Sequence, residues 1–154
     1  MTQLIDTAVR FMKEEDWRFA RRQDSSVLEL RFHGDNGQWT CFAETREEQG
    51  QLVFYSICPL STPADQRLAM AELLTRANFG LIMGNFEMDF ADGEIRFKTS
   101  IDVEDDRLSV ALVRSLVYAN VLTMDKYLPS IARLLHGNIS PAEAIDEVER
   151  ASSI

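Results

Sequence analysis

Cysteine and histidine are scarce in the 154-residue chain, which holds two of each. Cys41 and Cys58 are too few for a disulfide scaffold or a cysteine-only zinc site. His33 and His136 cannot form a His-rich metal site alone, and we interpret both as solvated or structural side chains. The sequence therefore predicts no metal centre, and no pattern in it calls for another cofactor.

Long apolar runs and basic residues are also lacking. No run reaches the ~18 residues that span a bilayer. The first residues show no basic region followed by an apolar block, so we expect no secretory leader and a cytoplasmic protein. Lys and Arg number 16 against 25 Asp and Glu, which gives a net charge of −9. This balance counts against a nucleic-acid-binding protein and against a protein held on anionic membrane by charge.

Two common catalytic signatures are missing as well. The chain has neither a Gly-x-x-x-x-Gly-Lys-Ser/Thr phosphate loop nor a Gly-x-Ser-x-Gly nucleophile elbow. The acidic run Asp102–Asp106 lacks the central glycine of a calcium loop, and we interpret it as a solvated connector that leads into a helix. The sequence thus predicts a protein that is not an enzyme.

What the chain does contain is the composition of a globular protein, with 45% hydrophobic and 27% charged residues and no repeat or linker. We expect a single domain over residues 1–154. Apolar periodicity predicts an α+β domain of two layers, an antiparallel sheet with helices on one face. The expected helices cover residues 4–15, 63–79, 110–136 and a short segment from 141; the expected strands cover residues 17–21, 28–32, 39–45, 52–58, 86–90 and 95–101.

Local signals predict several details of these elements. Thr62 is a suitable N-cap for the second helix, with Pro63 in the first helical position. Ser109 can cap the third helix, and Ser140 opens a capping box at the start of the last one. Asn36-Gly37 favours a tight primed turn with positive φ angles. Pro129 lies inside the third helix and is expected to kink or break it.

The last hairpin carries a register prediction. A two-residue Asp92-Gly93 loop would place apolar pairs on one face and opposite charges on the other. The expected pairs are Phe90 with Ile95, Met88 with Phe97, Asp89 with Arg96, and Glu87 with Lys98.

The two cysteines depend on the length of the turn around Gln49-Gly50. A two-residue loop would set Cys41 opposite Cys58, where a redox bridge is conceivable. A four-residue loop would set Cys41 opposite Ser56, and a three-residue loop would place the thiols on different faces. Free cysteine is commonly a small buried hydrophobe, so we favour two reduced thiols.

Several strings resemble the YbjN-domain family, whose members are described as bacterial sensory transduction regulators. The most specific is NFGLIMGNFEMD, residues 78–89, followed by DGEIRF, residues 92–97. Shorter matches lie at residues 37–39, 54–56 and 137–144, and the likeness runs from Trp17 to Val148. The resemblance implies a fold similar to that of type III secretion chaperones, small acidic proteins that dimerise and bind segments of other proteins. It implies no catalytic residues.

The string from Asn78 to Asn85 has two interpretations. Gly80 suits a helix stop with positive φ, and Gly84 suits close backbone approach at the start of a strand. Asn78 and Asn85 can satisfy backbone groups at the two ends of the connection. We favour this structural corner over a weak ligand site formed by the same four residues.

The third helix carries more apolar residues than one sheet can cover. Surplus apolar area on a small domain favours a partner surface, and a second copy is the simplest partner. We therefore predict a homodimer through this helix; the alternative is that the first and last helices cover its second face within one chain. The residues assigned to the dimer helix are Val113, Leu116, Val117, Val121 and Met124, and further apolar residues around it are Val110, Ala111, Leu112, Tyr118, Ala119 and Leu122.

Together these features predict a non-enzymatic homodimeric module that binds a segment of another protein by strand addition or groove contacts. Arg31, Phe42, Val53 and Tyr55 are the expected contact residues, on whichever sheet face stays open. The alternative is a small-molecule sensor or cryptic enzyme with a pocket between sheet and helices. A structural subunit of a larger complex is a third possibility.

Overall fold

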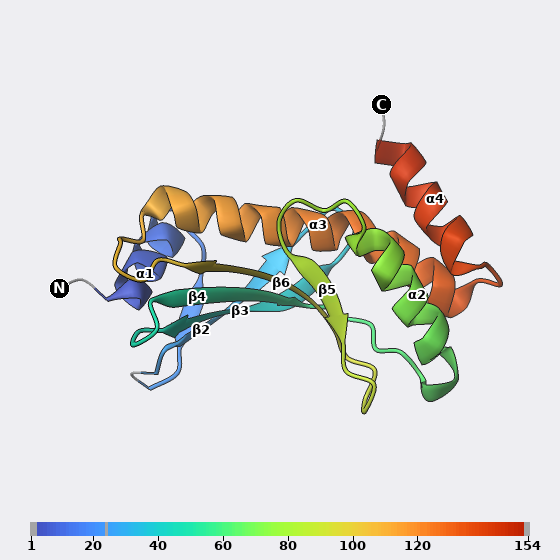
Figure 1. Ribbon diagram of the computed structural model, residues 1–154, viewed down its shortest axis with the longest axis horizontal. Coiled ribbons are helices and arrows are strands. Elements are labelled where there is room, and N and C mark those ends of the chain that lie inside the picture. The colour runs from blue at the N-terminus through green and yellow to red at the C-terminus, as the bar shows by residue number, and fades with distance from the viewer. Residues whose placement is uncertain (1–2, 24, 153–154) are drawn as a thin grey trace.

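The computed structural model describes residues 3–23 and 25–152, and within them four α-helices and six strands follow the expected order (Figure 1). The predicted sequence of elements is confirmed. The elements are α1 (Leu4–Glu14), β1 (Phe19–Arg21), β2 (Val27–His33), β3 (Gln38–Arg46), β4 (Gln51–Ile57), the 3-10 helix η1 (Ala64–Gln66), α2 (Arg67–Asn78), β5 (Asn85–Met88), β6 (Ile95–Asp102), α3 (Val110–His136) and α4 (Pro141–Ser152).

The strands form one antiparallel sheet in the order β1-β2-β3-β4-β6-β5. Helices α1 and α3 lie along one side of this sheet, and α2 and α4 gather at the end of α3 beside β5 (Figure 1). The other side of the sheet carries no helix among the described residues. The predicted α+β class, with helices on one face, is confirmed. None of the described helices is long and apolar enough to cross a membrane.

The core lies between the sheet and α3. Strand residues alternate between buried and partly exposed, so one face of each strand points into the core. Trp39, Phe54 and Phe97 are the largest buried side chains contributed by β3, β4 and β6. The apolar stripe of α2 is buried as predicted, through Met70, Leu73, Leu74 and Ala77.

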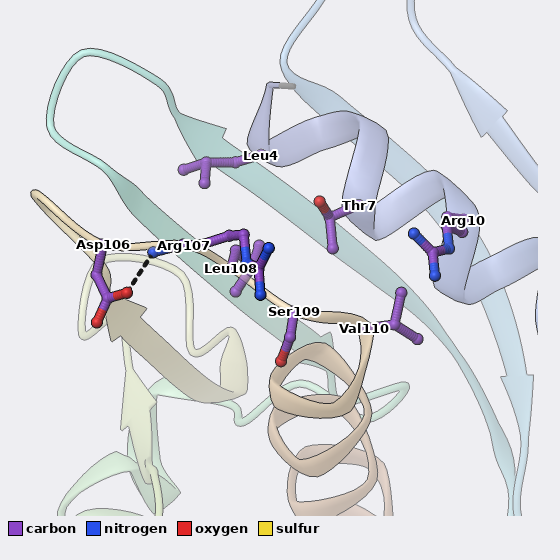
Figure 2. A pocket seen from close by; sticks show the side chains of 8 residues that line it. All are labelled: Leu4, Thr7, Arg10, Asp106, Arg107, Leu108, Ser109 and Val110. Carbon is purple, nitrogen blue, oxygen red and sulfur yellow. Dashed lines mark hydrogen bonds between the residues drawn. The ribbon is translucent and has the colours of Figure 1, made fainter. Parts of the chain in front are cut away.

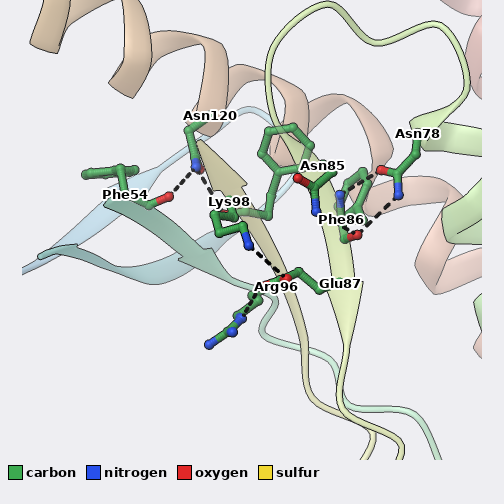
Figure 3. A network of polar contacts seen from close by, with 9 residues as sticks. Phe54, Asn78, Asn85, Phe86, Glu87, Arg96, Lys98 and Asn120 are labelled. Carbon is green, nitrogen blue, oxygen red and sulfur yellow. Dashed lines mark hydrogen bonds and ion pairs between the residues drawn. The ribbon is translucent and has the colours of Figure 1, made fainter. Parts of the chain in front are cut away.

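Polar contacts fix α3 over the centre of the sheet. The Asn120 side chain is fully buried, and its Nδ2 donates to the carbonyl oxygens of Phe54 on β4 (2.9 Å) and Phe97 on β6 (3.0 Å) (Figure 3). The Thr99 hydroxyl donates to the Leu116 carbonyl at 3.0 Å. A buried polar group costs free energy unless it is hydrogen-bonded, so these contacts select one position of the helix on the sheet.

Pro129 lies inside one continuous helix, α3, so of the predicted kink or break the break does not occur. A proline inside a helix leaves the carbonyl four residues earlier without its usual donor. Here that carbonyl belongs to Asp125, and it accepts a hydrogen bond from Asn36 Nδ2 at 2.9 Å. A non-local side chain thus replaces the missing N–H, and the helix continues to His136.

The β2–β3 turn is held by the same residue of α3. The Asp125 carboxylate accepts the backbone N–H groups of Asp35 (3.0 Å) and Asn36 (2.8 Å). Gly34 N–H donates to the Gly37 carbonyl, so the turn is centred on residues 35–36, and Asn36 has no positive φ. The predicted primed Asn36-Gly37 turn is therefore wrong. The Asp125 carboxylate instead holds the N–H groups of Asp35 and Asn36, the two residues at the centre of the turn.

The predicted register of the last hairpin is also wrong, by two residues. Phe86 lies opposite Phe97, Glu87 opposite Arg96 and Met88 opposite Ile95, and the loop spans residues 89–94. Since a shift of two residues keeps each side chain on its face, the division into apolar and charged faces survives. Phe90, placed on the apolar face by the prediction, is exposed in the loop.

Thr62 explains that longer loop and is not a helix cap. Its N–H donates to the Gly93 carbonyl at 3.0 Å, and a side chain on Gly93 would meet the Thr62 carbonyl oxygen. The Thr62 hydroxyl is buried without a hydrogen-bond partner among the described residues. The helix begins instead with η1 after Pro63. The predicted caps at Ser109 and Ser140 are confirmed, because each hydroxyl accepts a backbone N–H of its helix.

We expect Asp125→Ala to lower the free energy of unfolding by about 2–3 kcal/mol, because it leaves the N–H groups of Asp35 and Asn36 without their charged acceptor. Urea denaturation measures this value. Asp35→Ala is the matched control; it removes an exposed carboxylate from the same turn and should cost less than about 0.5 kcal/mol. Equal stabilities of the two variants would contradict the role of the Asp125 carboxylate.

Candidate functional site

The face of the sheet without helices is the candidate functional surface. The strands place Arg31, Phe42, Val53 and Tyr55 together on this open face, where they are exposed or half-buried. Phe42 lies opposite Tyr55 on the neighbouring strand, and Tyr55 lies opposite Lys98. The sequence pattern grouped these four residues but left open which face of the sheet is bare. The alternation of buried and exposed residues along β2, β3 and β4 shows that they lie on the bare face.

The centre of the open face is aromatic and its margins are charged. The Arg96 guanidinium lies 4.5 Å from the centre of the Tyr55 ring, and that of Arg22 lies 5.6 Å from the centre of the Phe42 ring. Both distances are within the range of cation–π attraction. Aromatic side chains combined with arginine are the residue types that contribute most to protein–protein binding.

Glu87 on β5 organises one margin of this face (Figure 3). Its carboxylate accepts from Arg96 Nε at 2.6 Å and from Lys98 Nζ at 3.1 Å. Partial burial raises the pKa of Glu87, but the hydrogen bonds and positive charges of Arg96 and Lys98 outweigh it, so this pKa lies below its usual value. The carboxylate thereby also holds Arg96 over Tyr55.

The corner between α2 and β5 has structural contacts. Asn78 Oδ1 accepts the Phe86 N–H at 2.7 Å, and Asn78 Nδ2 donates to the Phe86 carbonyl at 3.1 Å (Figure 3). Asn85 Nδ2 donates to the same carbonyl. Gly80 and Gly84 both have positive φ, and a side chain on Gly84 would meet the Lys98 carbonyl oxygen. These contacts are those of a structural corner.

The loop within that corner carries exposed apolar side chains that the sequence analysis did not single out. Phe79 is 90% exposed and Ile82 is 96% exposed, and Met83, which lies between Ile82 and Gly84, is also exposed. The available signal was an apolar run, Phe79–Met83, in a segment interpreted only through its glycines and asparagines.

The residues predicted for the dimer helix do not form a surface. All five are buried against the sheet within one chain: Val113, Leu116, Val117, Val121 and Met124. This assignment needs correction, because these positions make up the inward stripe of α3. The apolar residues exposed on α3 are Leu112 (40%) and Leu122 (57%), with Ala111 beside Leu112.

The cysteines follow the four-residue alternative. Cys41 lies opposite Ser56, and both Cys41 and Cys58 are free and buried. Burial raises the pKa of Cys41 to about 12 and that of Cys58 to about 11. Since the thiolate is the reactive form, neither thiol is poised for redox chemistry near neutral pH.

A cavity of about 600 Å³ lies between α1 and the connector that leads from β6 to α3 (Figure 2). Arg10 of α1 and Arg107 of the connector extend toward it, above an apolar wall that includes Leu4 and Leu108. Arg10 forms an ion pair with Glu14, whereas the Arg107 side chain makes no hydrogen bond or ion pair with another described residue. Asp106 also lines the cavity, and its carboxylate accepts the Arg107 N–H, so the two guanidinium groups are the groups that an anion would contact there.

The histidines and the acidic run do not form a metal site. His33 and His136 are exposed on different elements. Asp102 and Asp106 accept backbone N–H groups of their own connector. In residues 3–23 and 25–152, no group of three or more His, Cys, Asp or Glu is placed to hold a metal ion.

A family model, YbjN, described as "Putative bacterial sensory transduction regulator", matches residues 6–133. None of the curated proteins matches the sequence. The solved structure of "YbjN, a putative transcription regulator from E. coli" is similar with a TM-score of 0.61 and 11% identity, over 82% of this chain and 92% of the other.

Two further solved structures share the fold, and both are complexes. The first is the HopA1–SchA chaperone–effector complex, with a TM-score of 0.53 and 14% identity over 78% of this chain and 88% of the other. The second is the ExsC–ExsE complex, with a TM-score of 0.55 and 11% identity over 87% of this chain and 97% of the other. At these identities the likeness establishes the fold alone.

The lowered pKa of Glu87 predicts a pH-dependent contribution to stability. A lowered folded-state pKa stabilises the protein above the unfolded pKa, ~4.3, and this contribution is lost as pH falls through the folded value. We expect Glu87→Gln to cost about 1 kcal/mol at pH ~7 and less at pH ~3, as urea denaturation would measure. The control is Glu72→Gln, which breaks a helical pair with Arg76. A cost for Glu87→Gln that is equal at both pH values would contradict the assignment.

Proposed function

The chain belongs to the YbjN family, and from that premise we propose that it is a non-enzymatic, homodimeric regulatory module of the cytoplasm. In this proposal the open face of the sheet binds a segment of another protein. The observation that carries the proposal is the aromatic pair Phe42 and Tyr55, held by arginines on a face that none of the described helices covers. Apolar and aromatic area left exposed on a small domain favours a partner.

The similar solved structures support a protein partner. One is named as a chaperone–effector complex and another as the ExsC–ExsE complex, and this chain covers most of the matched chain in each. A shared fold does not fix function, so the argument depends on the chemistry of the face itself. That chemistry, aromatic at the centre and charged at the margins, suits a polypeptide with apolar anchors and a polar periphery.

The dimer in this proposal uses the outward side of α3. Leu112 and Leu122 are exposed there on a helix whose inward stripe is already satisfied by the sheet. Two-fold dimers are the commonest assembly of such domains, and they bury the same patch on both copies. This outward side replaces the inward stripe as the proposed contact.

The cavity beside α1 supports a second candidate function, a sensor of a small anionic molecule. The supporting observation is that Arg10 and Arg107 extend toward one space above apolar side chains. A ligand there would stabilise the folded protein by mass action.

The open-face proposal is tested by placing a photo-crosslinking phenylalanine analogue at Phe42 and irradiating the protein in cells that express its natural partners. We expect a covalent adduct with another protein from this position. The same analogue at Glu72, exposed on α2, is the control and should give none. Adducts from Glu72 alone would place the partner on the helical side and contradict the proposal.

A matched truncation measures the strength of the contact. Phe42→Ala with Tyr55→Ala should weaken binding of the crosslinked partner at least about tenfold, because truncating an aromatic anchor costs about 1–2 kcal/mol or more. Circular dichroism confirms that the variant is folded. Unchanged affinity in the folded double variant would contradict the role of the two rings.

The dimer is tested by sedimentation equilibrium. We expect the unmodified protein to sediment as a dimer and Leu112→Glu with Leu122→Glu to sediment as a monomer, because the interface would bury carboxylates without partners of opposite charge. Leu68→Glu, on a more exposed leucine of α2, should leave the dimer intact. A monomeric unmodified protein, or a double variant that stays dimeric, would contradict this interface.

A further inference from the structure

The two edges of the sheet differ, and one of them is closed. At β5, the side-chain amide of Asn78 takes both the N–H and the carbonyl of Phe86, with hydrogen bonds of 2.7 and 3.1 Å (Figure 3). These are the peptide groups that an added strand would need, since Phe86 is the second of only four residues in β5. Asn78 therefore blocks strand addition at this edge.

The opposite edge, β1, is open. Arg22 N–H donates to the Val27 carbonyl at 3.4 Å, so Arg22 and Val27 form a hydrogen-bonded pair. In an antiparallel ladder such pairs alternate with pairs whose peptide groups point away from the partner strand. Phe19 and Arg21 are thus the outward residues of β1. No hydrogen bond from another described residue reaches their outward peptide groups.

The same edge carries positive charge that the fold leaves uncompensated. The register pairs Phe19 with Leu30, and continuing it by one residue sets Arg18 opposite Arg31. Like charges directly opposite each other on neighbouring strands are destabilising. Arg18 makes no hydrogen bond or ion pair with a described residue, and Arg31 makes one contact of 3.5 Å with the neutral Gln38 side chain.

Two hollows meet at these arginines. One, of about 320 Å³, is lined by Arg18, Arg31 and Glu29; the other, of about 390 Å³, is lined by Arg18, Arg31 and Asp16. The Glu29 carboxylate is already paired with Arg22 at 2.9 Å. Asp16 forms no ion pair with either arginine in the structure. The hollows thus present two guanidinium groups without a carboxylate bound to them.

We propose that the β1 edge accepts an extended segment of the protein partner as an added strand, with acidic side chains at alternate positions that face Arg18 and Arg31. The peptide groups of Phe19 and Arg21 supply the backbone hydrogen bonds. The carboxylates bridge the two arginines and relieve their repulsion. This inference rests on the proposed function, because it names the chemistry and the entry point of the partner segment.

The test uses a labelled peptide of about ten residues, a usual strand length, in which Glu alternates with Val and Thr. Fluorescence anisotropy measures its affinity for the full chain. We expect binding, and binding at least about tenfold weaker for the same peptide with Lys in place of Glu, because like charges oppose each other. Equal affinity of the two peptides would overturn the proposal.

Protein variants locate the peptide. Arg18→Glu with Arg31→Glu should weaken binding of the Glu peptide at least about tenfold. Arg46→Glu with Arg76→Glu makes the same change in net charge away from β1 and should have no effect. If both variants weaken binding equally, the attraction is not specific to β1 and the proposal fails.

Hydrogen exchange distinguishes strand addition from charge attraction alone. In the unmodified protein, adding the Glu peptide should slow exchange of the Phe19 and Arg21 amides, which point outward, and leave the inward Ala20 amide unchanged. Binding without protection of Phe19 and Arg21 would overturn the proposed strand. The proposed function is judged separately, because Phe42→Ala with Tyr55→Ala tests the open face while leaving Arg18 and Arg31 in place.

Discussion

The buried amide of Asn120 is the contact on which the arrangement of the two layers depends. Its donors reach the carbonyl oxygens of β4 and β6 directly, so α3 must lie close along the middle of the sheet. A helix of 27 residues in this position, with α1 beside it, lies along one side of the sheet. The remaining helices pack at the end of α3 beside β5 rather than beneath the sheet. The bare face that carries Phe42 and Tyr55 is therefore a consequence of how α3 is seated.

A second polar contact extends the same constraint to the other half of the sheet. Asp125 binds the β2–β3 turn through its carboxylate, and its carbonyl binds Asn36 in place of the N–H that Pro129 lacks. A proline inside a helix ordinarily costs about 3 kcal/mol. Here part of that cost is offset by a hydrogen bond that joins two distant segments. One helix thus holds β2 and β3 at the turn and β4 and β6 at the centre, so it fixes the strands that form the open face relative to one another.

Much of this arrangement could be predicted from the sequence, because it depends on local patterns. Alternation identified the strands and their buried faces, and the hydroxyls of Ser109 and Ser140 marked two helix starts. The failures have non-local causes. The loop around Asp92-Gly93 is longer than predicted because Gly93 packs on Thr62. Helix α3 continues past Pro129 because the Asn36 side chain, from the β2–β3 turn, donates to the Asp125 carbonyl. Alternation also placed the four residues predicted for partner contact on one face of the sheet. Which stripe of α3 is buried depends on the sheet beneath it, and the pairing of Asn78 with Phe86 left no periodic signal.

The two surfaces of interest share one residue, and this sharing limits how a single partner can bind. Arg31 belongs both to the open face and to the hollows beside β1. Two residues before Arg31 on β2, Glu29 begins a row of side chains across the sheet: Glu29 lies opposite Phe42, Phe42 opposite Tyr55, and Tyr55 opposite Lys98. A segment that adds to β1 extends along the strand axis, whereas this row of side chains crosses the sheet from strand to strand. A partner that uses both must therefore turn after the edge, with acidic residues in its extended part and apolar residues in the part that crosses the face. Because Asn78 closes the β5 edge to an added strand, the extended part lies at β1 and the crossing part runs from there toward β6.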